Sequence, residues 1–124
     1  MKRDMDLLRA LLLKVEETPA GTPTGTGRWF KIEVDGCTPD EVCYNALLAK
    51  DAGLIEAKFL GGSNEFVVQR LTFAGHEFLD AAREDKVWNK AKQTILSNAG
   101  ALTLEAMKAA LSMLMQHAAH SKIA

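Results

Sequence analysis

Residues 38–71 read TPDEVCYNALLAKDAGLIEAKFLGGSNEFVVQRL, and this stretch decides the fold of the chain. Its first half predicts one helix with a sharp start. Thr38, Pro39 and Glu41 occupy the N-cap, the first and the third helical positions, as in a capping box. Gly53 is the residue type that ends helices in a left-handed conformation, so the helix is expected to stop there.

After Gly53 the pattern changes from helix to strand. The segments LIEAKFL and EFVVQRL flank the turn residues GGSN, which predicts a β-hairpin. Upstream, the stretch WFKIEV at 29–34 alternates apolar and charged residues, as a half-buried strand does. We expect this segment to pair antiparallel with one arm of the hairpin and to complete a three-stranded sheet.

The remaining elements are helices. Residues 4–17 place apolar side chains three and four apart, with Asp4 as a candidate N-cap. Residues 18–27 are almost entirely Gly, Pro, Thr and Ala, which predicts a connector. Three further helices are expected after the hairpin, with Thr72 and Thr103 as N-caps of the first and last.

A helix followed at once by a twisted hairpin is typical of the second half of a winged helix. The predicted fold class is α+β: a winged-helix-like domain over residues 1–83 with a small three-stranded antiparallel sheet, and additional C-terminal helices over 84–124. These helices are expected to pack on the domain or on a partner chain. A complete helix-turn-helix has two helices before the hairpin, and only one fits between Gly36 and Gly53.

Composition and charge narrow the class of protein. The formal net charge is -1, which gives no global attraction to nucleic acid. Residues 37–82 carry a net charge of -4, whereas residues 83–124 carry +3. With no signal peptide, no apolar run long enough for a membrane, and two cysteines without metal-ligand spacing, we expect a cytoplasmic protein with reduced thiols, no cofactor and no metal.

Three segments carry a resemblance to a known family. They are MKRDMDLLRALLLKVEE at 1–17, AGLIEA at 52–57 and QRLTFAGHEFLDAAREDKVWNKAK at 69–92. The chain resembles a bacterial and phage family catalogued as domain of unknown function 2513, whose members share the same start and an RLTxxGHxFLD segment. The resemblance implies a small winged-helix-like domain and supplies no catalytic or binding residues. Family members often have Tyr-His where this chain has Tyr44-Asn45.

The sequence leaves two functions open. The first is a DNA-binding transcriptional regulator or phage accessory factor that contacts duplex DNA. The second is a protein-interaction module, which the acidic residues of the capped helix favour. No catalytic set is visible, so an enzyme is not expected. The candidate DNA contacts lie on the capped helix and on the hairpin: Tyr44, Asn45, Lys50, Lys58 and Arg70.

The last predicted helix presents an apolar stripe. Monomers rarely expose a patch of this size, so we expect a homodimer in which the helix meets a partner's copy. The alternative is that the helix folds back on Trp88 and Ile95 of its own chain. The candidate interface residues stand three and four apart: Leu104, Met107, Leu111, Leu114 and Ala118.

Overall fold

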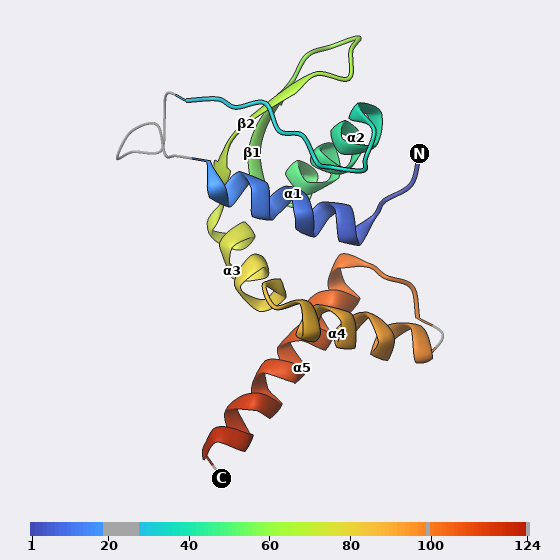
Figure 1. The fold of residues 1–124 in the computed structure, drawn as a ribbon, viewed down its shortest axis with the longest axis vertical. Helices are drawn as coiled ribbons and strands as arrows, with labels where there is room; N and C mark the ends of the chain where they lie inside the picture. Colours follow the sequence, from blue (N-terminus) through green and yellow to red (C-terminus); the bar gives the residue numbers. More distant parts are fainter. Residues whose placement is uncertain (19–27, 99, 124) are drawn as a thin grey trace. The chain divides into compact units, whose positions relative to one another are not determined.

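The computed structural model describes residues 1–18, 28–98 and 100–123, with the side chains described as far as residue 115 (Figure 1). The predicted connector at 18–27 lies almost wholly outside these residues. The elements, in chain order, are α1 (Met5–Glu17), α2 (Pro39–Asp51), β1 (Ile55–Phe59), β2 (Phe66–Leu71), α3 (Phe73–Ala82), α4 (Asp85–Ser97) and α5 (Leu104–Ile123). No helix in the described part is both long enough and apolar enough to cross a membrane.

The chain forms two compact units, Met1–Glu77 and Phe78–Ala124, which divide within α3. The first unit holds α1, α2 and the hairpin, and the second holds α4 and α5 with the end of α3. The division lies six residues before the predicted one at 83, because α3 supplies its first turns to one unit and its last turns to the other.

The N-terminal helix of the first unit begins at the predicted cap. The Asp4 carboxylate accepts the backbone N–H of Leu7 at 3.1 Å, which satisfies one of the amides left unpaired at a helix start. Six of the thirteen residues of α1 are buried, since its apolar side chains recur every three and four positions. This wide apolar face makes α1 a core helix.

The capping box at the start of α2 is confirmed. The Glu41 N–H donates to the Thr38 hydroxyl at 3.2 Å, and the Thr38 N–H donates to the Glu41 carboxylate at 3.0 Å. At the other end, Gly53 adopts a φ of 76°, the left-handed conformation that only glycine adopts without strain. The chain therefore leaves the helix abruptly and enters β1.

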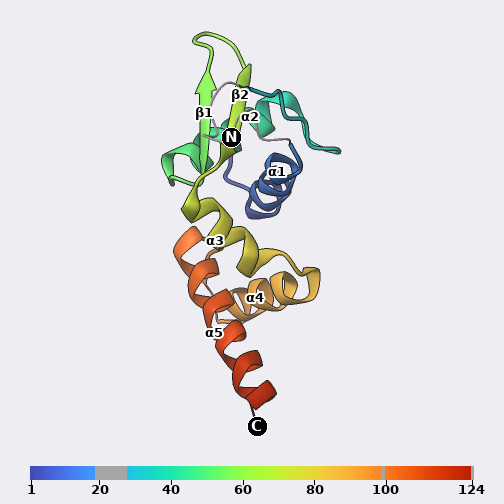
Figure 2. The ribbon, with the colours of Figure 1, turned by 90° about the vertical axis from the view of Figure 1, so that its left-hand side faces the viewer.

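The hairpin has one covered and one uncovered face. The side chains of Ile55, Ala57 and Val68 are buried, whereas those of Glu56 and Lys58 are exposed. Helix α2 contacts β1, α1 contacts β2, and the two helices contact each other (Figure 2). Both helices thus cover the same face of the hairpin, and neither helix covers the opposite face, here called the outer face.

The predicted three-stranded sheet is wrong. The sheet has two strands, and the segment 29–34 contributes a single antiparallel bridge between Phe30 and Val68. Its burial still alternates, with Ile32 buried between the exposed Lys31 and Glu33. Alternating apolar and charged residues indicate that one side of an extended chain faces the core. They do not require that its backbone forms hydrogen bonds with an adjacent strand. The segment then turns at Gly36 (φ 80°) toward α2.

The second unit has a core of its own. The ring of Phe78 meets that of Trp88 edge to face, with centroids 6.2 Å apart. Helix α5 packs on α4 (Figure 1), and the predicted cap of α5 is confirmed because the Ala106 N–H donates to the Thr103 hydroxyl at 3.1 Å. The other buried apolar side chains of this unit are Leu79, Ala82, Ala91, Ile95, Met107, Ala110 and Leu111.

Candidate nucleic-acid interface

The outer face of the hairpin gathers two of the predicted DNA contacts. Lys58 points outward because it alternates with the buried Ala57. A register shift in the sheet places Arg70 opposite Glu56, while Ala57 stands opposite Val68. This β-bulge turns Arg70 to the same face as Glu56, and the Arg70 guanidinium donates to the Glu56 carboxylate at 2.8 Å.

An aromatic residue from another segment joins this face. The Lys58 ammonium lies 4.4 Å from the centroid of the Trp29 ring, a cation–π contact. Trp29 reaches the hairpin because the neighbouring Phe30 pairs with Val68 through two hydrogen bonds of 2.8 Å. The sequence places Trp29 at the start of the segment 29–34, and its contact with Lys58 could not be predicted because spacing alone does not assign the partner of that segment.

The charge of Arg70 is partly compensated. Its guanidinium also donates to the Leu71 carbonyl at 3.1 Å, and its side chain and that of Glu56 are 46% and 45% exposed. An ion pair this exposed contributes little to stability and can be exchanged for another anion. Arg70 is therefore positioned on the face while its charge stays accessible.

Asn45 lies away from any surface that a nucleic acid could reach. Its side chain is 1% exposed, and its oxygen accepts the backbone N–H of Asp4 at 2.8 Å. Its amide donates to the Glu41 carbonyl at 3.0 Å and to the Lys2 carbonyl at 3.4 Å. Asn45 thus ties the chain start to α2 and serves the fold.

The other two candidates belong to α2, on the covered side of the hairpin. Tyr44 is half-buried, and Lys50 is exposed on the last turn with its ammonium 5.6 Å from the Phe59 ring centroid. Phe59 in turn stacks on Phe66 at 5.4 Å. The structure therefore brings Lys58 and Arg70 together and leaves Tyr44, Asn45 and Lys50 elsewhere.

The candidate dimer residues divide by burial. Met107 and Leu111 are fully buried in the core of the second unit, whereas Leu104 and Leu114 are half-buried. Ala118 lies beyond the described side chains. The next exposed apolar side chains on α5 are Met113 and Met115, which are 69% and 52% exposed. Within one chain, the centre of the stripe is therefore already covered, and these two methionines are not.

The two cysteines of the first unit are free thiols, and both are half-buried. Burial raises the pKa of the Cys37 thiol, and the carboxylates of Glu41 and Asp4 add to the shift. Burial likewise raises the pKa of Cys43, with a contribution from Asp40. Among the described residues, no group of three or more His, Cys, Asp and Glu side chains is arranged to hold a metal ion.

Comparison with known proteins agrees with the resemblance in the sequence. A family model described as "Hypothetical protein (DUF2513)" matches residues 2–101. An uncharacterized protein of Haemophilus influenzae is 39% identical over 110 residues, which cover 87% of this chain and 90% of that protein. No solved structure matches the chain. The match spans the capped helix with its hairpin and extends through α4 of the second unit, so the chain belongs to the DUF2513 family of proteins of unknown function.

Proposed function

We propose that this chain is a cytoplasmic, non-catalytic regulator or accessory protein that binds duplex DNA through the outer face of its hairpin. The observation that carries the proposal is the grouping of Lys58 over Trp29 with Arg70 on one exposed face. Cations beside an aromatic ring supply phosphate contacts and a stacking surface together. The two cations Lys58 and Arg70 are both exposed on this face.

The hairpin is a better contact element than the capped helix. A two-stranded ribbon fits the major groove of B-DNA, as a helix does. Helix α2 carries Asp40, Glu41 and Asp51 against the single Lys50, and three carboxylates would repel the phosphates. Among the described residues of the hairpin, the outer face carries one acid, Glu56, and its carboxylate is already paired with Arg70.

Electrostatics set the expected strength of binding. Residues 1–77 contain nine basic and twelve acidic residues, a net charge of -3, so the unit as a whole is repelled by DNA. Binding then depends on orienting the outer face. With Lys58 and Arg70 available, log affinity should fall with log salt with a slope of about -2.

The test is a fluorescence-anisotropy titration of a mixed-sequence duplex at low ionic strength. The double variant Lys58→Glu with Arg70→Glu should reduce affinity at least about tenfold, because two attractive charges become repulsive. Lys86→Glu with Lys90→Glu, on α4, is the matched control with the same change in net charge. Equal losses in both pairs would indicate a general charge effect, and no binding by the wild type would overturn the proposal.

A homodimer is part of the proposal. Two-fold dimers present two copies of a DNA-binding face to two half-sites, which multiplies a weak single contact. The exposed Met113 and Met115 on α5 support such an assembly, since methionine side chains form adaptable apolar interfaces.

The second candidate is a protein-interaction module without DNA binding. The net charge of -3 on residues 1–77 favours it, since an acidic unit is better matched to a basic protein surface than to phosphates. Failure of the duplex to bind at low salt, with the protein folded, would shift the assignment to this candidate.

A further inference from the structure

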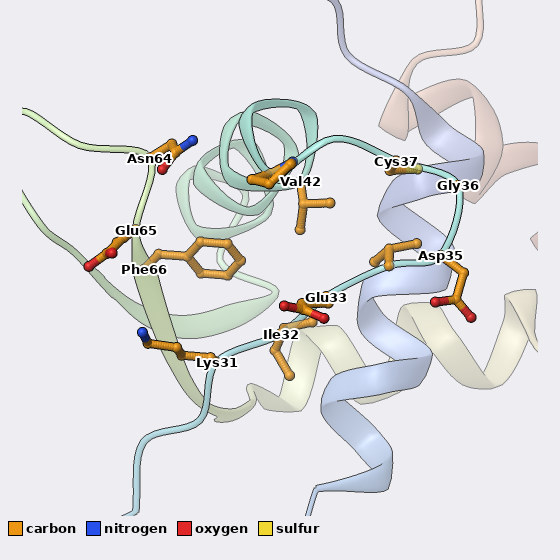
Figure 3. Close-up of a pocket in the computed structure, with 12 residues that line it drawn as sticks. Lys31, Ile32, Glu33, Asp35, Gly36, Cys37, Val42, Asn64, Glu65 and Phe66 are labelled. Carbon is orange, nitrogen blue, oxygen red and sulfur yellow. The ribbon is translucent and has the colours of Figure 1, made fainter.

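A cavity of about 550 Å³ opens after the Phe30–Val68 bridge, where the segment 31–37 separates from the hairpin (Figure 3). One side of the cavity is formed by residues 31–37. The other side is formed by Asn64 and Glu65 of the hairpin turn and by Phe66, the first residue of β2. The cavity lies wholly within the first unit and on no residue of the outer face. The cavity exists because the segment 29–34 pairs with β2 only at the Phe30–Val68 bridge and forms no third strand.

Both walls of the cavity carry backbone groups that face into the gap. The Leu60 N–H donates to the Glu65 carbonyl, so the backbone of Glu65 faces the β1 side of the hairpin. The backbone of Val68 bonds to Phe30 instead, so it faces the other edge of β2. Because strand residues alternate, the N–H and C=O of Phe66 point to the same edge as those of Val68. Among the described residues, the backbone of Phe66 has no hydrogen-bond partner on the edge of β2 that bonds to Phe30. The backbone of Ile32, two residues after the Phe30–Val68 bridge, has no such partner either.

The floor of the cavity is apolar and its rim is acidic. The Phe66 ring extends from β2 toward Val42 and Glu33 (Figure 3), and Phe66, Val42 and Ile32 are all mostly buried. The charged residues that line the cavity are Glu33, Asp35 and Glu65 against Lys31, a net charge of -2. All four are exposed, and none of the three carboxylates has an ion-pair partner among the described residues.

We propose that this cavity binds a short extended segment of a partner protein that carries basic side chains next to apolar ones. The free strand edge at Phe66 supplies hydrogen bonds to the peptide backbone, as in strand addition to a sheet. The apolar floor takes one side chain, and the carboxylates hold the neighbouring lysine or arginine. This inference goes beyond DNA binding and gives the second candidate function its class of partner.

The charge of the rim selects the occupant. An anionic ligand would be repelled, because the lining carries a net charge of -2. A purely apolar ligand would exclude water from beside three carboxylates without giving them a partner, which is unfavourable. A small cation alone would leave the Phe66 and Ile32 backbone groups unused. A basic and apolar extended peptide satisfies the backbone edge, the floor and the rim together.

The probe is a fluorescein-labelled hexapeptide of alternating valine and arginine with capped ends, compared with the same peptide carrying glutamate for arginine. Anisotropy titration of the full chain should show binding of the arginine peptide and none of the glutamate peptide. A version with alternate backbone amides N-methylated should not bind, because it cannot pair with a strand edge. Hydrogen exchange of the Phe66 amide, followed by NMR, should slow on binding.

The double variant Glu33→Lys with Glu65→Lys should bind the arginine peptide about tenfold more weakly, as expected for two exposed ion pairs. It should also gain affinity for the glutamate peptide, which a variant that merely loses its fold would not do. Glu17→Lys with Asp51→Lys is the control, since both residues are exposed and lie at the ends of α1 and α2. This control should bind like the wild type.

Three results would each overturn the inference. They are no binding of the arginine peptide to the wild type, equal losses in the two double variants, and unchanged exchange of the Phe66 amide in the complex. Duplex titrations of the same variants separate this inference from DNA binding, because the cavity charges and the outer-face cations are different residues. Peptide binding without DNA binding would leave the inference intact and remove only the DNA function.

Discussion

Gly75 lies so close to Leu54 that a Cβ added to it would come within 2.0 Å of the Leu54 carbonyl oxygen. The same oxygen accepts the backbone N–H of Thr72 at 3.0 Å. The Thr72 hydroxyl donates to the Gly53 carbonyl and accepts the Gly75 N–H, the latter at 3.0 Å. The first turn of α3 is therefore fixed on the residues that follow α2, and the AGLIEA and RLTxxGH segments meet at this junction.

Gly75→Ala is expected to destabilise the chain by about 2–4 kcal/mol, because the new methyl group would overlap backbone atoms that cannot rotate away. Urea unfolding followed by circular dichroism is the measurement. Gly61→Ala is the control, since no atom lies within 4 Å of a Cβ there and its φ is not in the left-handed region. That variant should be neutral or slightly more stable. Superimposable unfolding curves for Gly75→Ala and the wild type would contradict the prediction.

The junction also explains the segment that resembles the family most closely. Thr72 caps α3, Gly75 permits the close approach, and Phe78 and Leu79 are buried in the core of the second unit. Packing therefore accounts for Thr72, Gly75, Phe78 and Leu79 in this segment. His76 is exposed, and its backbone N–H donates to the Thr72 carbonyl at 3.0 Å.

Asn45→Ala is expected to cost about 2 kcal/mol, since it leaves the part-buried N–H of Asp4 without its acceptor. Asn45→Asp should be at least as harmful, because a carboxylate cannot donate to the Glu41 and Lys2 carbonyls. Asn89→Ala, at an exposed position of α4, is the control and should change stability little. Stability is read from urea unfolding. Wild-type stability with altered DNA affinity in Asn45→Ala would contradict the structural role.

Local features of the fold were predictable from the sequence, whereas pairings between distant segments were not. The caps at Asp4, Thr38, Thr72 and Thr103 depend on residues three positions away, and all four form as expected. The alternation at 29–34 correctly predicted that Lys31 and Glu33 are exposed, with Ile32 buried between them. Whether that segment pairs with β2 along its length depends on the positions of its two ends. The turn at Gly36 directs the chain away from β2 and toward α2.

The candidate site shows the same limit. Lys58 could be placed on an outward face from strand alternation alone. The bulge that turns Arg70 outward and the bridge that brings Trp29 beneath Lys58 both depend on register, which alternation does not fix. Asn45 looked available because polar residues on a helix are usually exposed, and only the position of the chain start shows that it is enclosed.

Acid should weaken the capping box. The pKa of the Glu41 carboxyl is lowered, chiefly because the carboxylate accepts the Thr38 backbone N–H. A group whose pKa is lowered on folding stabilises the protein above its unfolded pKa and loses that contribution as pH falls through the folded pKa. The difference in unfolding free energy between the wild type and Glu41→Gln should therefore be present at neutral pH and should decrease as pH falls below the unfolded glutamate pKa of about 4.3. A difference that persists unchanged in acid would contradict this account.

Removing the other half of the box should cost more at neutral pH than in acid, because the Thr38 side chain also helps to lower the pKa of Glu41. Thr38→Ala is expected to cost about 1 kcal/mol, the usual loss for an N-cap. Thr103→Ala, at the start of α5, is a second cap removal of the same kind in the other unit. Thermal unfolding followed by circular dichroism measures both. A loss in Thr38→Ala that grows toward low pH would indicate an effect other than the loss of the cap.

Two substitutions on α5 separate a core position from an interface position. Leu111 is fully buried among the side chains of the second unit, so Leu111→Glu should place a carboxylate in an apolar core and lower the helix content. Met113→Glu with Met115→Glu changes side chains that are 69% and 52% exposed, so the fold should survive. If α5 forms the proposed homodimer, this double variant should be a folded monomer while the wild type is a dimer. Light scattering at several concentrations, together with circular dichroism, distinguishes these results, and a wild type that remains monomeric at high concentration would exclude the dimer.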